Sequence, residues 1–369
     1  MPVHLPSVPY VAGSPVGDDG AADREPGAGW LVRLWVIALG LAVVTLWRSS
    51  VVDIPVRDPG GEILRARIAI TAGTFVALAL LDAVRRVPRG RRAPRPVAEM
   101  LRRRWPTRRL LVAASALLAY HLVYAGYHNL KSWDALNPPR DQALTWIDQA
   151  LFLGHSPAVL LHSVLGERWA AYALVIVYES FPTLVSIAFV ACVVFADRLR
   201  DGTVFLASAS WVWVLGVACY YAVPSLGPFN DRPQDFAGLP HTIVTTTQTT
   251  YMAQRAHLLA DPSAHDAFAQ VSAFASLHVG VTTVIVLMAA YYRLRRIAVV
   301  LSVYLALTVV ATVYLGWHFA VDDIAGLAIG AAAVGLGIVT IYPTRRSRRR
   351  VQAVGRFAGR EWAHDHRSV

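Results

Sequence analysis

Lysine is almost absent from this chain of 369 residues: Lys131 is the only one, so nearly all of the positive charge comes from arginine. Cysteine is nearly as scarce. Cys192 and Cys219 both lie inside apolar stretches, which argues against a disulfide framework and against a thiolate metal site. Charged residues make up only 16% of the chain, whereas 55% of it is hydrophobic and the mean hydropathy is +0.44. This composition places the chain with membrane proteins and not with soluble domains.

The formal net charge of +11 does not indicate a nucleic-acid partner. A nucleic-acid-binding protein gathers its basic residues on one soluble face, whereas here the arginines form short runs between apolar stretches. Such runs are typical of the loops that orient membrane helices. We therefore expect no nucleic acid among the partners.

Apolar runs long enough to cross a hydrocarbon core predict an all-α, polytopic membrane helix bundle with about eight transmembrane helices. The runs lie at 30–48, 63–84, 109–127, 169–195, 203–223, 272–292, 297–316 and 319–341. Four regions follow from this pattern: a disordered cytoplasmic tail (1–29), three added helices with an Arg-rich loop (30–127), a catalytic membrane domain (128–342) and a basic cytoplasmic tail (343–369). The broken apolar pattern at 137–165 predicts an outer interfacial helix. Residues 230–270 are predicted to form a long outward connection.

The arginine runs predict which side each loop faces, because cytoplasmic loops collect Arg and Lys. With eight spans, the runs at 85–109, 198–200, 293–296 and 345–350 all fall on one side, together with both termini. The opposite loops carry only scattered charges. We therefore expect a multi-pass protein of the cell membrane with both termini in the cytoplasm.

Two short motifs flank apolar helices on the side opposite the arginine runs. Ser276-Leu277-His278 opens one helix, and His318-Phe319-Ala320-Val321-Asp322 opens another. Residues four apart share a helix face, so Asp322 can orient the His318 imidazole and stabilise positive charge on it. Ionisable groups at such positions are functional candidates. The spacing does not form a compact metal-ligand motif, so we expect no metal and no cofactor.

This pair of motifs suits in-line phosphoryl transfer. The imidazole of His318 would attack phosphorus, and His278 would give a proton to the departing oxygen. The first turn of the helix after Ser276 offers free backbone N–H groups and the positive end of a helix dipole, with the Ser276 hydroxyl as a further donor to a phosphate.

The same residues resemble the membrane-bound type 2 phosphatidic acid phosphatase superfamily, in the branch that includes inositol phosphorylceramide synthase. The stretch from Phe274 to His278 is similar to the second signature motif of that branch, and Tyr314 to Gly326 is similar to the third. The resemblance covers roughly 140–340 and implies a six-helix phosphatase-like core. It also implies that His318 becomes phosphorylated, that Asp322 activates it and that His278 is the acid.

The wider superfamily has basic residues in its first motif and before the third-motif histidine, and this chain has none at the corresponding places. Arg140 and Arg255 are candidate substrate-binding residues, together with Ser276 and with Glu179, a carboxyl group inside a predicted span. Other outward-facing cations that could bind phosphate are Lys131, Arg168 and Arg232.

We expect a lipid phosphotransferase or phosphatase that acts on a membrane lipid at the extracytoplasmic face. An alcohol or polyol acceptor is a possible partner, and the oligomeric state is unknown. A non-catalytic lipid carrier or transporter is the alternative. Internal symmetry would support that alternative, but the two halves show no convincing repeat.

Overall fold

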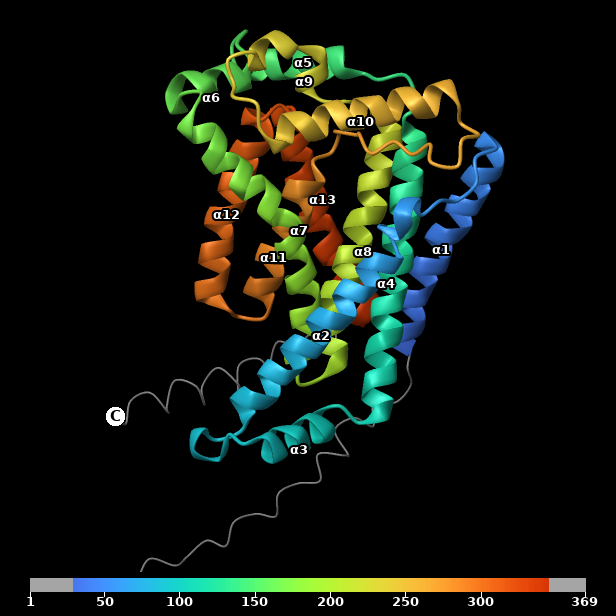
Figure 1. Cartoon of the computed structure of the whole chain (residues 1–369), viewed down its shortest axis with the longest axis vertical. Coiled ribbons are helices and arrows are strands. Elements are labelled where there is room, and N and C mark those ends of the chain that lie inside the picture. The colour runs from blue at the N-terminus through green and yellow to red at the C-terminus, as the bar shows by residue number, and fades with distance from the viewer. Residues whose placement is uncertain (1–28, 345–369) are drawn as a thin grey trace, which may run out of the picture.

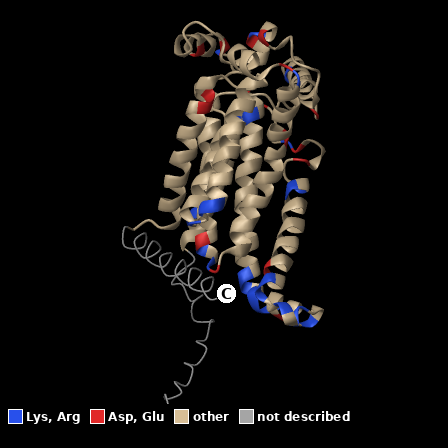
Figure 2. Ribbon diagram, turned by 90° about the vertical axis from the view of Figure 1, so that its left-hand side faces the viewer, with Lys and Arg blue, Asp and Glu red and all other residues tan. Residues whose placement is uncertain are grey.

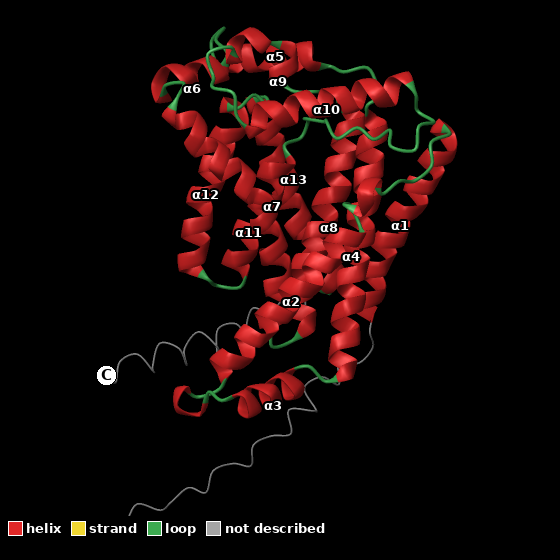
Figure 3. Cartoon of the chain, in the orientation of Figure 1, coloured by secondary structure: helices red, strands yellow, loops and turns green. Residues whose placement is uncertain are grey.

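The computed structural model describes residues 29–344, so the expected tails at 1–29 and 343–369 lie almost entirely outside it. Within the described residues the chain forms helices and no strands, as expected (Figure 3). Seven helices are long and apolar enough to cross a membrane. They are α1 (Gly29–Val52), α2 (Arg65–Arg86), α4 (Thr107–Asp134), α7 (Trp169–Phe195), α8 (Leu199–Ala222), α12 (Arg295–Tyr314) and α13 (Ala320–Ile341).

The eighth predicted span is the short helix α11, Leu277–Tyr291. Its predicted start at residue 272 is wrong by five residues, because Ser276 caps the helix and its hydroxyl accepts the Val279 N–H at 3.4 Å. Fifteen residues span about 22 Å, which is less than a typical hydrocarbon core. Non-helical backbone from 267 to 276 precedes the helix. The start of α11 therefore lies where the chain leaves regular structure.

Four short elements cover one end of the bundle (Figure 1). They are α5 (Asp141–Leu151), α6 (Pro157–Leu165), α9 (Pro228–Asp231) and α10 (Ile243–Ala260). The segment that was expected to form one interfacial helix is thus two, α5 and α6. The long outward connection expected at 230–270 contains a helix, because residues 243–260 form α10. Threonine is a weak helix former, but Thr245 accepts the Thr242 N–H at 2.9 Å, and Val244, Gln248 and Leu258 are buried against the bundle.

The other end of the bundle carries most of the arginine (Figure 2). There the short helix α3 (Pro94–Arg104) lies across the ends of the spans. Asp82 on α2 binds both Arg86 and Arg104, at 2.9 and 3.3 Å, and both arginines also reach Asp197 in the loop between α7 and α8. These ion pairs tie the Arg-rich loop to the bundle.

Helix α13 packs closely against the start of α11. A Cβ added to Gly326 would come within 2.5 Å of the Ser276 carbonyl oxygen, and one added to Gly330 would come within 2.5 Å of the Gly280 carbonyl oxygen. Only glycine allows this approach, and small residues at helix interfaces are the usual means of close packing in lipid. The two sequence motifs are thereby brought together.

Replacement of Gly326 by Val is expected to destabilise the protein by about 1–3 kcal/mol, because the added methyl groups collide with backbone. The check is the midpoint of thermal unfolding in detergent. Gly335 on the same helix has nothing within 4 Å of an added Cβ, so Gly335→Val is the matched control. Equal midpoints for the two variants would contradict the packing described above.

Candidate functional site

The Ser276 and His318 motifs meet directly through the backbone. The Ser276 N–H donates to the Asp322 carbonyl oxygen at 3.0 Å. His318 lies in the turn between α12 and α13, where Gly316 adopts a positive φ of 77° and the N–H groups of Trp317 and His318 both donate to the Thr312 carbonyl oxygen. This turn lets the chain reverse direction and present the imidazole before α13 begins.

Asp322 backs the imidazole of His318. The carboxylate is fully buried, and its Oδ2 lies 3.5 Å from His318 Nδ1 while accepting the Phe319 N–H at 3.0 Å. The spacing of 3.5 Å is longer than a good hydrogen bond, and within the described part of the chain Nδ1 has no hydrogen-bond partner. Catalytic hydrogen bonds commonly tighten when substrate binds. Asp322 is therefore placed to hold the imidazole through Nδ1.

The surroundings of His318 keep its imidazole neutral. Only 5% of the residue is exposed. Burial lowers the pKa of His318 to about 4, although the nearby Asp323 carboxylate acts in the opposite direction. A neutral imidazole has a free lone pair, which a nucleophile needs.

Asp323 is a second buried carboxyl group in this cluster, and the sequence motif left it only as a neighbour of Asp322. It accepts the Thr312 hydroxyl at 2.8 Å. It therefore joins the end of α12 to the first turn of α13, where the neighbouring Asp322 carbonyl oxygen accepts the Ser276 N–H. This position makes it a residue that holds the two motifs in register.

His278 projects from the first turn of α11 toward His318. Its ring stacks on Tyr178 of α7 with centroids 4.3 Å apart and lies 4.3 Å from the ring of Phe181. The centroids of His278 and His318 are 6.2 Å apart. Two imidazoles at this separation can act on one tetrahedral centre and on the group that leaves it.

Both histidines line a cavity of about 350 Å³. Its wall combines aromatic rings with polar groups, including Tyr178, Glu179 and Trp317. Pockets of a few hundred Å³ with a few convergent polar groups are typical of small-molecule sites. Groups of three or more His, Cys, Asp or Glu side chains suited to holding a metal do not occur among residues 29–344.

The structure brings together some of the predicted site residues and separates others. His278, His318 and Glu179 line the cavity, and Asp322 lies behind His318. Ser276 is fully buried and caps α11, so its side chain does not line the cavity. Arg255 reaches the Ala135 carbonyl oxygen at 3.4 Å, and Arg140 is an exposed residue at the start of α5. Neither of these arginines lines the cavity.

Two carboxylates of α5 support the site from outside the motifs. Asp148 accepts the N–H groups of Ala320 and Val321 at 2.7 and 3.0 Å, so it caps α13 from a different helix. Asp141 accepts the N–H groups of Leu226 and Gly227, at distances of 2.8–3.1 Å. Burial raises the pKa of both carboxyl groups, although these hydrogen bonds favour the charged form. Asp141 and Asp148 are seven residues apart, which is about two helical turns, and this spacing was the signal in the sequence that both lie on one face of a helix.

The lining also contains two basic side chains, Arg67 of α2 and Lys131 of α4. Lys131 was one of several candidate cations from the sequence. Nothing in the sequence singled out Arg67, because it lies near the start of a predicted span and far along the chain from the motifs.

A family model described as the PAP2 superfamily matches residues 142–336, just over half of the chain. The match includes both motifs and begins after α4. No curated protein and no solved structure matches the chain.

Replacement of Asp148 by Ala is expected to cost about 0.5–2 kcal/mol of stability, as the loss of a helix cap does. The N–H groups of Ala320 and Val321 would lose their acceptor, so their hydrogen exchange should accelerate. Exchange measured by mass spectrometry on peptides from the start of α13 checks this. Asp266, an exposed carboxylate that binds His257, provides the control variant Asp266→Ala. Unchanged exchange in Asp148→Ala would show that the cap is dispensable.

Proposed function

The chain belongs to the PAP2 superfamily, and on that premise we propose that it is an integral membrane phosphatase or phosphotransferase acting on lipid phosphates or phospholipid head groups through a phosphohistidine at His318. One observation carries the proposal. His318, backed by Asp322, and His278 come from different helices and face one cavity with ring centroids 6.2 Å apart. A nucleophile, the group that orients it and a proton donor are the parts that the reaction needs.

In the first step Nε2 of His318 attacks phosphorus, because Nδ1 faces Asp322. A P–N bond forms as the P–O bond to the leaving group breaks, and His278 gives its proton to the departing oxygen. In the second step a water or an alcohol attacks the phosphohistidine. His278 takes the proton of that nucleophile, and the P–N bond breaks. Asp322 stabilises the positive charge that develops on His318 in each step.

The arrangement of charge along the bundle supports an extracytoplasmic site. The Arg-rich loops gather at the end of the bundle near α3, and α5 and α10 cover the opposite end (Figures 1 and 2). Thr247 and Tyr251 of α10 are among the residues that line the cavity. Cytoplasmic loops collect arginine, so the site faces the opposite side and both termini face the cytoplasm.

The size and lining of the cavity support a head group as the part of the lipid that is bound. A volume of about 350 Å³ accommodates a phosphorylated head group but not a whole phospholipid. The resemblance to the branch that includes inositol phosphorylceramide synthase favours transfer to an alcohol or polyol over transfer to water.

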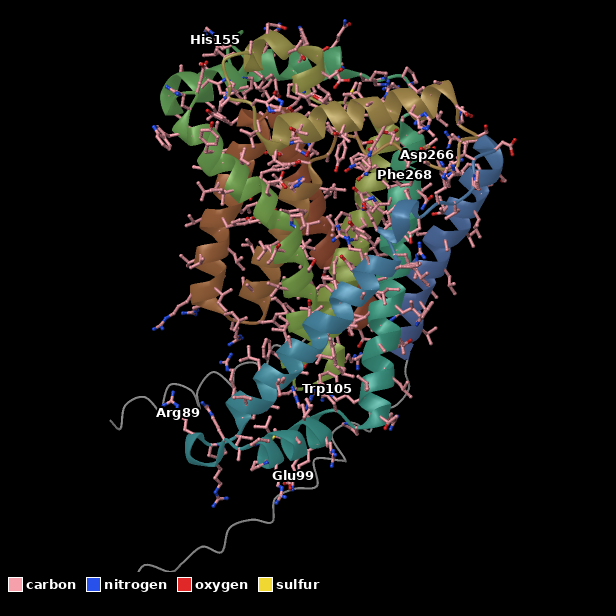
Figure 4. All side chains as sticks on the ribbon, viewed as in Figure 1. Arg89, Glu99, Trp105, His155, Asp266 and Phe268 are labelled. Carbon is pink, nitrogen blue, oxygen red and sulfur yellow. The ribbon has the colours of Figure 1, made fainter. Side chains whose placement is uncertain are left out.

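Replacement of His318 by Ala is expected to abolish turnover and the trapping of labelled phosphate on the protein. Replacement of His278 by Asn is expected to slow the reaction on the order of 10²–10⁴-fold, the usual contribution of a general acid. The assay measures release and trapping of radiolabelled phosphate from lipid phosphates in detergent. His155, an exposed histidine near the short helices α5 and α6, provides the control variant His155→Ala (Figure 4). Full activity of His318→Ala would refute the phosphohistidine mechanism, and absence of turnover in the wild-type protein would favour the non-catalytic lipid carrier.

The pKa of His318 predicts how kcat/KM changes on the acid side of the pH profile. The neutral form of His318 is the reactive one, so this requirement is met above its pKa and is lost as the pH falls through that value. Because burial lowers the pKa to about 4, kcat/KM should not decline near pH 6.5, the ordinary value for histidine, on account of this group. Rates in mixed micelles between pH 4 and pH 8 check this. A decline of kcat/KM centred near pH 6.5 that persists in His278→Asn would contradict this prediction.

The products distinguish the two reactions. Purified protein incubated with a labelled lipid phosphate monoester should yield free phosphate if water is the acceptor, and the phosphomonoester of an added polyol such as inositol if the polyol is the acceptor. With a labelled phospholipid as the donor, transfer to the polyol should yield a new phosphodiester, whereas hydrolysis should yield a phosphomonoester. Thin-layer chromatography and mass spectrometry of the products separate these outcomes.

A further inference from the structure

A phosphoryl group that reacts in an apolar cavity needs positive charge beside it. Only two Lys or Arg side chains line the cavity in the described part of the chain, Arg67 and Lys131. Both precede residue 142, so the family-matching region supplies none. We propose that Lys131 and Arg67 bind the anionic head group of the substrate, with Lys131 at the phosphoryl group that reacts with His318. The assignment rests on the function proposed above.

Lys131 is close to the reacting histidines. It lies in the last turn of α4, lines the cavity with His278 and His318, and its charge lowers the pKa of His318. Its Nζ lies 5.8 Å from the centre of the Tyr220 ring, which also lines the cavity. The ammonium group therefore lies beside a ring of the same cavity that His278 and His318 line.

Lys131 has no carboxylate partner that would account for it as a structural ion pair. None of the ion pairs formed within residues 29–344 includes it. The nearest carboxylate along α4 is Asp134, which accepts hydrogen bonds from Asn137 at 2.9 Å and Ser272 at 3.0 Å. An unpaired cation within a membrane protein is costly, and a contact with an aromatic ring offsets only part of that cost. A phosphate in the cavity would complete the pairing.

Arg67 provides the second positive charge farther from the histidines. Its guanidinium carbon lies 5.0 Å from the centre of the Tyr124 ring. Tyr124 and Lys131 are seven residues apart on α4, which is about 10 Å along the helix. The helix that carries Arg67 is held against α4 by the hydrogen bond between Thr71 and His121 at 3.0 Å. Arg67 is thus placed to contact the part of the head group beyond the reacting phosphorus.

Arg232 is the strongest competing cation, because it lines a small pocket that also includes His318. That pocket has a volume of only about 20 Å³, close to the size of one water molecule. The guanidinium is also engaged by both oxygens of Asp235, at 2.8 and 3.3 Å. The pocket therefore has no space for a head group, and the charge of Arg232 is already paired with Asp235.

The decisive variant is Lys131→Met, which keeps the length of the side chain and removes its charge. We expect kcat/KM for a lipid phosphate to fall on the order of 100-fold, as when one electrostatic contact to a transition state is lost. Lys131→Arg should recover at least a tenth of the wild-type value. Arg67→Gln should raise KM for a phospholipid more than for a lipid phosphate monoester, which lacks the distal head group.

The matched control is Arg65→Gln. Arg65 is exposed, lies on the same helix two residues from Arg67 and does not line the cavity, so wild-type kinetics are expected. Wild-type kcat/KM in Lys131→Met would overturn the assignment of Lys131, and equal effects of Arg67→Gln on both substrates would overturn that of Arg67. If His318→Ala stayed active, the proposed function itself would fail, whatever the other variants show.

A binding measurement avoids the risk that a variant misfolds. Lys131 is the only lysine in the chain, so unsubstituted protein that carries [6-¹³C]lysine has a single labelled side chain. Titration with inorganic phosphate should shift its ¹³C signal in saturable fashion in the wild type and in Arg65→Gln. A signal that does not move at phosphate concentrations that inhibit turnover would overturn the assignment.

Discussion

The need to satisfy backbone polar groups where the chain leaves its helices is the constraint on which this site depends. Three non-helical segments converge near the cavity, at 223–227, 267–276 and 315–319. In an apolar setting each unpaired N–H or C=O group costs several kcal/mol. Carboxylates and carbonyl groups of neighbouring segments therefore take up these N–H groups. The hydrogen bonds of Asp141, Asp148 and Asp322 are examples.

This network also sets the relative position of the two histidines. The Phe229 N–H donates to the Gly316 carbonyl oxygen and the Phe274 N–H donates to the Ser225 hydroxyl, both at 2.9 Å, so each segment is held by another. His318 and His278 lie near the ends of two of these segments, 315–319 and 267–276. Their relative position follows from backbone pairing and from the close contact of Gly326 with the Ser276 carbonyl oxygen, and not from a contact between the rings alone.

The cavity extends beyond the region that matches the family. Helices α2 and α4 precede that region, yet they form part of the wall of the cavity. Among the described residues they contribute all of the Lys and Arg side chains that line it. Positive charge near a reacting phosphate can come from any element that reaches it, because electrostatic attraction depends on position and not on order in the chain. A family motif that lacks a cation can thus be complemented by helices outside the motif.

The sequence alone determined the class of fold and located the two motifs. Apolar runs located the spans, since crossing a membrane requires length and apolarity that few other structures need. The four-residue step from His318 to Asp322 predicted their contact, although His318 lies in the turn before α13 and not on a shared helix face. Tertiary structure decided the rest. It made Ser276 the cap of α11, formed a helix at 243–260 and brought Arg67 and Lys131 into the lining of the cavity that both histidines share. Such outcomes depend on contacts between residues far apart in the chain, which local periodicity does not encode.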